Sequence, residues 1–326
     1  MDKLKNRSFL LRIIGTLLAI ILLVYLLAEQ GWAAILAAVK TIPPLYLLLA
    51  FGLVMISRMA VVARWHTLLK GSGLQIRFGQ TVRITFAGLF AANFLPTTIG
   101  GDVVRLAGAV RLKFDAALST ASLIADRLVG MFGMALALPL GIPSFIRTIN
   151  AANPAGAIST NWIGTTGFLS LLTGWERIWK KVTDFWGHLT SALAIYLKRP
   201  GSLLIALVYS IVHMACIFTI IYLLFKGEGQ PISWGLIAGL YSLVYFVTLL
   251  PISINGYGLQ ELSMTLIFSR VAGVSIGSSL TVALLLRTMM MIASLPGAFF
   301  ISGILAGEEP GSPETRQAVS ESDSRI

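Results

Sequence analysis

The sequence predicts an all-α polytopic membrane protein, a helix bundle with two re-entrant broken-helix hairpins related by a pseudo-two-fold inverted repeat. Hydrophobic residues make up 56% of the 326 residues and charged residues only 12%, whereas a soluble chain is about a quarter charged. Mean hydropathy is +0.83. The apolar residues run together rather than alternating, which disfavours a β-barrel. These observations exclude a soluble enzyme, a nucleic-acid-binding module and a disordered chain.

The positive charge lies in the membrane body and not in the C-terminal tail. Net charge is +11, from 25 Lys and Arg against 14 Asp and Glu, and the tail from 307 to 326 holds five of the acids and two of the bases. Residues 1–306 therefore carry 23 bases and nine acids. This excess predicts anchoring on the cytoplasmic side and attraction to anionic lipid headgroups or phosphates.

The apolar runs divide the chain into spans and shorter segments. Full spans are predicted at 10–27, 45–63, 119–140, 157–173, 202–225 and 281–305, and the basic, Trp-rich stretch 175–199 predicts a helix in the membrane interface. Counting basic loops places both termini in the cytoplasm. We therefore expect a basic cytoplasmic N-terminus (1–9), a transmembrane domain (10–305) with halves at about 10–174 and 200–305, and a disordered acidic cytoplasmic tail (306–326).

Two shorter apolar segments, 84–95 and 234–250, each run into a similar turn. Residues 95–101 read LPTTIGG and residues 250–256 read LPISING. Proline interrupts a helix, and glycine permits left-handed or close-packed backbone. Backbone N–H and C=O groups that lack helical partners at membrane depth must face protein or a water-filled cavity. Paired interrupted segments of this kind point to a transporter's binding site. The predicted turn residues are Asn93, Pro96, Gly100, Gly101, Pro251, Ser253, Asn255, Gly256 and Gly258.

Charged residues beside these turns are the candidate site. Each charge at the bilayer centre costs about 2.5–3.5 kcal/mol on insertion scales, so such residues must pair or meet water. Asp102 and Arg105 are spaced i, i+3 and can pair locally. Neighbours on a helix point about 100° apart, so Asp126 and Arg127 need separate partners. The candidate lipid-headgroup and translocation residues are Asp102, Arg105, Asp126, Arg127, Glu261 and Arg287.

The alternative interpretation is that these charges are structural ion pairs which fix helix register. For Arg58, Arg64 and Arg83 a structural role is favoured, with Arg58 and Arg83 reaching to the cytoplasmic surface. We expect His213 to be packed and hydrogen-bonded within its apolar span.

Signatures of soluble catalysis are absent from the sequence. It holds no H-E-x-x-H motif, no Walker sequence, no G-x-S-x-G elbow and no cysteine pair, since Cys216 is the single cysteine. We therefore expect no metal, no cofactor and no enzymatic activity. Two alternatives stay open: an integral-membrane transferase that acts on a lipid phosphate, and a secondary transporter of a polar solute coupled to protons through Asp126 or Glu261.

At these residues the sequence resembles the lysylphosphatidylglycerol synthase transmembrane-region family, also called flippase-like or UPF0104 proteins. The resemblance rests on residues 93–105 (NFLPTTIGGDVVR), 126–130 (DRLVG) and 251–261 (PISINGYGLQE), and it covers about residues 10–305. The family often has Glu where this chain has Asp126. In two-part members a separate soluble domain makes the aminoacylated lipid from aminoacyl-tRNA, and the chain ends at Ile326 without one.

The resemblance implies translocation of an anionic or aminoacylated phospholipid, or of a polyprenyl-phosphate-linked lipid, across the cell (inner) membrane. Arg105, Arg127 and Arg287 would then hold the lipid phosphate by charge-assisted hydrogen bonds. Asp102 and Glu261 would orient those arginines or receive a cationic headgroup. The expected partners are membrane lipids and no nucleic acid. A second copy of the chain and a separate lipid-modifying enzyme are candidate protein partners.

Overall fold

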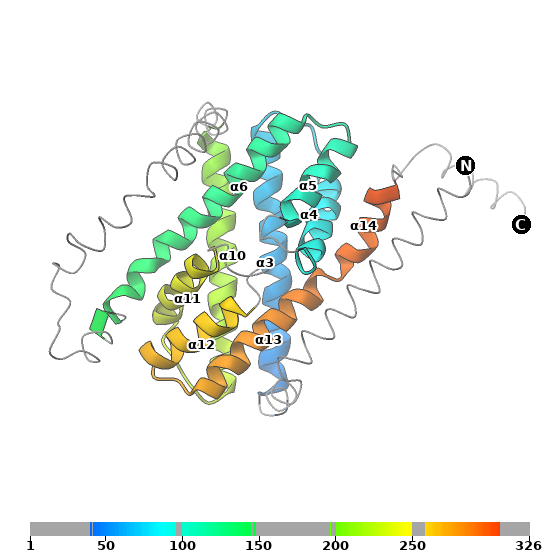
Figure 1. Cartoon of the computed structure of the whole chain (residues 1–326). Coiled ribbons are helices and arrows are strands. Elements are labelled where there is room, and N and C mark those ends of the chain that lie inside the picture. The colour runs from blue at the N-terminus through cyan, green and yellow to red at the C-terminus, as the bar shows by residue number, and fades with distance from the viewer. Residues whose placement is uncertain are drawn as a thin grey trace, which may run out of the picture.

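The computed structural model describes residues 40, 42–95, 100–144, 146–147, 196, 200–249 and 258–306. These residues form helices and turns, with no strand among them, which confirms the predicted all-α class (Figure 1). The helices are α3 (Pro44–Gly71), α4 (Phe78–Ala92), α5 (Gly100–Arg111), α6 (Ala116–Ala137), α10 (Pro200–Gly227), α11 (Trp234–Thr248), α12 (Leu259–Val271), α13 (Ile276–Ser294) and α14 (Pro296–Ala306), and the short 3-10 helix η1 (Leu138–Leu140) follows α6.

Several of the described helices are long and apolar enough to cross a membrane. They occupy Pro44–Gly71, Ala116–Leu140, Pro200–Gly227 and Ile276–Ile301, and each exceeds the roughly 20 residues that a bilayer core requires. The protein is therefore a multi-pass membrane protein, as predicted. The predicted spans at 10–27 and 157–173, the interfacial helix at 175–199 and the acidic tail lie outside the described residues.

Helix α3 continues eight residues beyond the predicted end of its span at Ala63. The sequence prediction ended the span at a run of polar side chains, but neither glycine nor proline interrupts the chain between Gly52 and Gly71. The polar groups of the last turns instead have partners inside the protein: Arg64 contacts Asp126, and the His66 ring contacts the Thr81 hydroxyl. Because these groups are paired, the helix need not end where the charges begin.

The order and lengths of the helices recur along the chain. Helices α3, α4, α5 and α6 contain 28, 15, 12 and 22 residues, and helices α10, α11, α12 and α13 contain 28, 15, 13 and 19 residues. In each series a long helix precedes two short ones and a second long helix follows.

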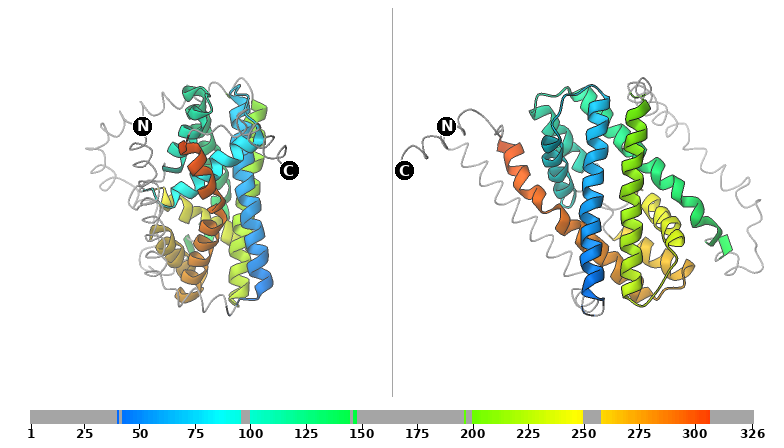
Figure 2. Two further views of the ribbon diagram at one scale, coloured as in Figure 1. Left: turned by 90° about the vertical axis from the view of Figure 1, so that its right-hand side faces the viewer. Right: turned by 180° about the vertical axis from the view of Figure 1, so that it is seen from behind.

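Helices α3 and α10 lie side by side and run antiparallel (Figures 1 and 2). The end of α3 meets the start of α10, where a Cβ placed on Gly71 would lie 2.6 Å from the Ser202 hydroxyl oxygen. At mid-helix the Ser57 hydroxyl is 2.7 Å from Nδ1 of His213, which confirms the hydrogen-bonded histidine that the sequence predicted. The two longest helices thus form a pair whose centre is a polar contact.

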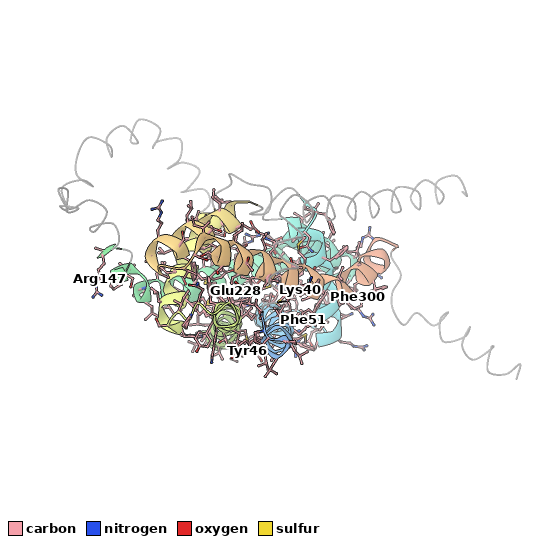
Figure 3. All side chains as sticks on the ribbon, turned by 90° about the horizontal axis from the view of Figure 1, so that it is seen from below. Lys40, Tyr46, Phe51, Arg147, Glu228 and Phe300 are labelled. Carbon is pink, nitrogen blue, oxygen red and sulfur yellow. The ribbon has the colours of Figure 1, made fainter. Side chains whose placement is uncertain are left out.

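The remaining helices cover one side of this pair (Figure 2, left). Helices α4 and α5 lie toward the end of the pair that holds Gly71, and helices α11 and α12 lie toward the opposite end (Figure 1). Viewed along the pair, the molecule is elongated, with Arg147 and Phe300 at its two extremes (Figure 3). The short helices of the two series therefore occupy opposite ends of the long ones.

Glycines allow the last segment of each series to pack on the other series. A Cβ on Gly297, at the start of α14, would lie 2.0 Å from the carbonyl oxygen of Phe86 in α4. A Cβ on Gly141, just after η1, would lie 2.6 Å from the carbonyl carbon of Gly239 in α11. Close approach of this kind is how helices associate in membranes, where small residues let the backbones touch. Each contact fixes a short helix of one half against the other half.

Candidate functional site

Helices α4 and α5 form a tight antiparallel hairpin. A Cβ on Gly101 would lie 2.8 Å from the Gly88 carbonyl oxygen, and one on Gly88 would lie 2.6 Å from Cγ of Arg105. One turn away, a Cβ on Gly108 would meet the Ile84 side chain at 3.0 Å. The glycines thus hold two backbones together and leave room for the Arg105 side chain. Gly101, which was predicted for the turn, is the second residue of α5.

Helices α3, α5 and α6 bring five charged side chains into one network, here called the first charge cluster. Arg64 Nε donates to Asp126 Oδ1 at 2.7 Å, and Arg105 Nη1 donates to Asp126 Oδ2 at 3.1 Å. Arg105 Nη1 also donates to Asp102 Oδ1 at 3.0 Å, the pairing that the i, i+3 spacing predicts. Arg127 Nε donates to the other oxygen of Asp102. Asp126 and Arg127 therefore have different partners, as their positions on one helix require.

The guanidinium group of Arg105 is held in place but keeps one edge without a partner. Its carbon lies 4.1 Å from the centre of the Trp65 ring, and Trp65 Nε1 in turn donates to the Ser122 hydroxyl at 3.0 Å. Within the described part of the chain, Arg105 Nε and Nη2 are buried and make no hydrogen bond. These two N–H groups are a preorganised fork of the kind that binds a carboxylate or phosphate bidentately.

A second charge cluster joins helices α12 and α13. Arg287 Nε donates to Glu261 Oε1, and Arg287 Nη2 donates to Gln260 Oε1 at 3.1 Å. Gly258, with φ of +74°, precedes α12 in the left-handed region that glycine was predicted to supply. Among described atoms, Glu261 Oε2 is buried without a hydrogen-bond partner.

The two clusters occupy corresponding places in the two helix series. In each, a carboxylate on the second short helix contacts an arginine on the following long helix: Asp102 contacts Arg127, and Glu261 contacts Arg287. Arg127 and Arg287 are each the twelfth residue of their helix, because α6 begins at 116 and α13 begins at 276. The first cluster adds the buried Arg64, Arg105 and Asp126 to this shared pair.

The structure corrects the prediction for Arg58, one of the two arginines assigned to the cytoplasmic surface, and it pairs Arg64 with Asp126 inside the bundle. Arg64 is buried in the first cluster. Arg58 is partly buried, and its Nη2 donates to the Met290 carbonyl oxygen of α13 at 3.2 Å. Both arginines project into the helix assembly because helices α6 and α13 pack on α3 there, so they do not reach the surface. Arg83, the other arginine assigned to the surface, is exposed as predicted.

The predicted turn residues are described only in part. Asn93 follows α4, and its Nδ2 donates to the Ser294 hydroxyl at 2.8 Å. Gly100 begins α5, where a Cβ would lie 2.4 Å from Cβ of Leu95. Pro96, Pro251, Ser253, Asn255 and Gly256 lie outside the described residues. Within the same described ranges, no group of three or more His, Cys, Asp or Glu residues is placed to hold a metal ion.

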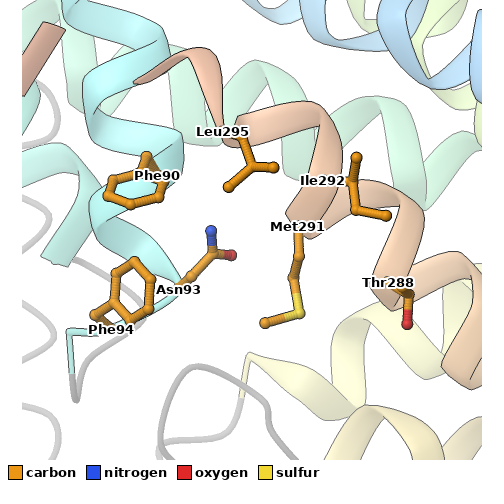
Figure 4. A pocket seen from close by; sticks show the side chains of 7 residues that line it. All are labelled: Phe90, Asn93, Phe94, Thr288, Met291, Ile292 and Leu295. Carbon is orange, nitrogen blue, oxygen red and sulfur yellow. The ribbon is translucent and has the colours of Figure 1, made fainter. Parts of the chain in front are cut away.

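A small apolar cavity lies beside the first hairpin, between the end of α4 and helix α13 (Figure 4). Its volume is about 60 Å³. Figure 4 shows aromatic rings on one side and the side chains of α13 on the other, with the Asn93 amide between them. The lining residues are Phe90, Asn93, Phe94, Thr288, Met291, Ile292 and Leu295.

Comparison with known proteins identifies the family of the chain. The family described as the lysylphosphatidylglycerol synthase transmembrane region matches residues 12–297, which is most of the chain. The chain belongs to this family. It is also similar to the UPF0104 membrane protein PH1989 of Pyrococcus horikoshii, with 30% identity over 129 residues. That alignment covers 38% of this chain and 36% of the relative, so it spans about a third of either protein.

Proposed function

We propose that the protein is a lipid translocator of the flippase type, which moves a lipid with an anionic phosphate-containing headgroup across the bilayer. This activity would place it in the cell inner membrane with both termini in the cytoplasm, and it involves no chemical conversion of the lipid. The lipid would be an anionic or aminoacylated phospholipid, or one linked to a polyprenyl phosphate.

The observation that carries the proposal is an excess of arginine over carboxylate inside the helix assembly. In the described residues, two charge clusters and Arg58 place five arginines against three carboxylates between the helices. Paired charges alone would fix helix register and leave little net charge. Two uncompensated cations in the membrane are costly, and a lipid phosphate on the path would offset that cost. These residues are Arg58, Arg64, Arg105, Arg127 and Arg287, with Asp102, Asp126 and Glu261.

The arrangement of the two halves supports alternating access from the two sides. Helices α4 and α5, and helices α11 and α12, have lengths of 15, 12, 15 and 13 residues, and each is too short to span the core alone. We interpret each pair as a re-entrant hairpin, entering from opposite faces, in an inverted repeat. The antiparallel pairing of the equivalent helices α3 and α10 and the crossed glycine contacts favour this interpretation. Inverted repeats with broken helices place the substrate site near the bilayer midplane.

The first charge cluster supplies the phosphate-binding site in this mechanism. Asp126 and Asp102 both accept hydrogen bonds from Nη1 of Arg105, and the Nε and Nη2 groups are left for the phosphate oxygens. Arg127, whose side chain is 38% exposed, would be the first arginine to meet an incoming headgroup. The apolar cavity beside the hairpin is suited to part of an acyl or prenyl chain.

Translocation in reconstituted vesicles tests the proposal. Phosphatidylcholine vesicles would carry a trace of fluorescent phosphatidylglycerol, and quenching from outside would report the fraction that has crossed. We expect wild-type protein to accelerate crossing over protein-free vesicles and Arg105→Met to lose most of that acceleration. Arg83→Met, which removes an exposed arginine, is the matched control and should behave as wild type. Crossing no faster than in empty vesicles would refute the proposal, and a new lipid product in the same vesicles would favour the transferase alternative.

A further inference from the structure

Arg58 is the one arginine of the assembly that no carboxylate contacts within the described part of the chain. Its hydrogen bond goes to the Met290 carbonyl oxygen, and its Nε is buried without a hydrogen-bond partner. Met290 comes three residues after Arg287 on α13, so this contact lies about one helical turn from the second charge cluster. Arg58 therefore lies next to the second charge cluster without belonging to an ion pair.

Arg58 lies at mid-length of its helix, beside the central contact between α3 and α10. It is the fifteenth of the 28 residues of α3, so it lies at the middle of a helix roughly 42 Å long. Its neighbour Ser57 makes the central contact with His213 of α10. These two residues occupy the same position in their helices, since each is the fourteenth residue of 28. Arg58 thus lies next to the point where the two halves of the molecule meet.

Arg64 and Arg287 lie on either side of this level. Arg64 is six residues farther along α3, which is about 9 Å toward the first hairpin. Arg287 comes three residues before Met290 on α13, and α13 rises from the opposite end of the assembly (Figure 1). Cations are therefore spaced along the depth of the bundle, with carboxylates beside the outer ones and none beside the middle one.

We propose that Arg58 is the midpoint contact for the lipid phosphate, between the proposed phosphate-binding site at Arg105 in the first half and the Glu261–Arg287 pair of the second half. This inference rests on the proposed function and adds a residue to it. At the outer positions a carboxylate holds each arginine while no lipid is present. At the midpoint the phosphate itself is the counterion, so its affinity there is greatest in the crossing state. An interaction made mainly in the crossing state raises the rate without tightening resting binding.

The test separates binding from crossing. Wild type, Arg58→Met, Arg58→Lys and the control Arg83→Met would be reconstituted with fluorescent phosphatidylglycerol, and phosphatidylglycerol binding would be measured on the same proteins by native mass spectrometry. We expect Arg58→Met to slow crossing by about tenfold or more while binding stays within about twofold of wild type. Arg58→Lys keeps the charge and should retain most of the rate.

Other outcomes overturn the inference in distinguishable ways. Wild-type crossing rates in Arg58→Met would show that the phosphate does not use Arg58, and the proposed function would stand. Equal losses of binding and crossing would mean that Arg58 binds the lipid in the resting state and is not a midpoint contact. If Arg58→Met does not fold, a rate for Arg58→Lys as low as that of Arg105→Met would indicate a purely geometric role. Wild-type protein without activity would overturn the proposed function and this inference together.

Discussion

Replacing Asp126 by Asn should destabilise the protein more than any exposed change, because it leaves two buried cations with one counterion. Asp126 is 2% exposed and accepts hydrogen bonds from Arg64 at 2.7 Å and Arg105 at 3.1 Å. Breaking a buried ion pair by removing one partner costs about 3–5 kcal/mol. Arg105 keeps Asp102 as a counterion, but Arg64 contacts no other carboxylate among the described residues, and its second hydrogen bond goes to the Ser210 hydroxyl at 3.3 Å. Most of the loss should therefore arise from Arg64.

A double-mutant cycle isolates that contribution. The free energy of unfolding in mixed micelles would be measured for wild type, Asp126→Asn, Arg64→Met and the double variant. Because Arg64→Met removes the stranded cation, the double variant should be more stable than the sum of the single effects predicts, by at least about 1 kcal/mol. Additive effects within about 0.5 kcal/mol would refute the reasoning, since they would mean that the two side chains do not interact as the structure places them.

Two further predictions concern packing and pH. Gly297→Ala should lower the melting temperature markedly, because its Cβ would lie 2.0 Å from the Phe86 carbonyl oxygen. Gly52→Ala is the control: its Cβ would have nothing within 4 Å, so it should be neutral or slightly stabilising. Equal melting temperatures for the two variants would contradict the contact between α14 and α4. Burial raises the pKa of the Glu228 carboxyl, opposed by a hydrogen bond from Ser278. Its ionisation thus weakens the fold as pH rises through the raised pKa. Glu228→Gln should therefore raise the melting temperature at pH 8 and change it least at pH 4, and the opposite order in a thermal-shift series would disprove the sign.

The helix order was predictable from the sequence because length and continuity of an apolar run are local properties. The turn sequences LPTTIGG and LPISING predict a repeat, and most of both turns lies outside the described residues. The break after Ser294 was not predicted, because the run from 281 to 305 reads as one span. Pro296 begins a new helix there, a position that tolerates proline because the first N–H groups of a helix have no intrahelical partner.

The candidate site was only partly predictable from the sequence, because contacts between distant helices leave no local signal. Asp102 and Arg105 are close in sequence, so their contact follows from helical spacing. Arg64 and Asp126 are 62 residues apart, so their contact depends on how α3 and α6 pack. A charge at the end of an apolar run is compatible with the membrane surface or with a buried partner. The absence of a helix breaker after Arg58 was the signal that could have placed Arg64 inside the bundle.

The most direct test of the account is an experimental structure of the protein in nanodiscs that contain an anionic phospholipid. The account predicts phosphate density within hydrogen-bond distance of Nε and Nη2 of Arg105, between two broken-helix hairpins that enter from opposite faces. Density for protein side chains at that edge, in a tightly packed bundle without lipid or water between the hairpins, would contradict it.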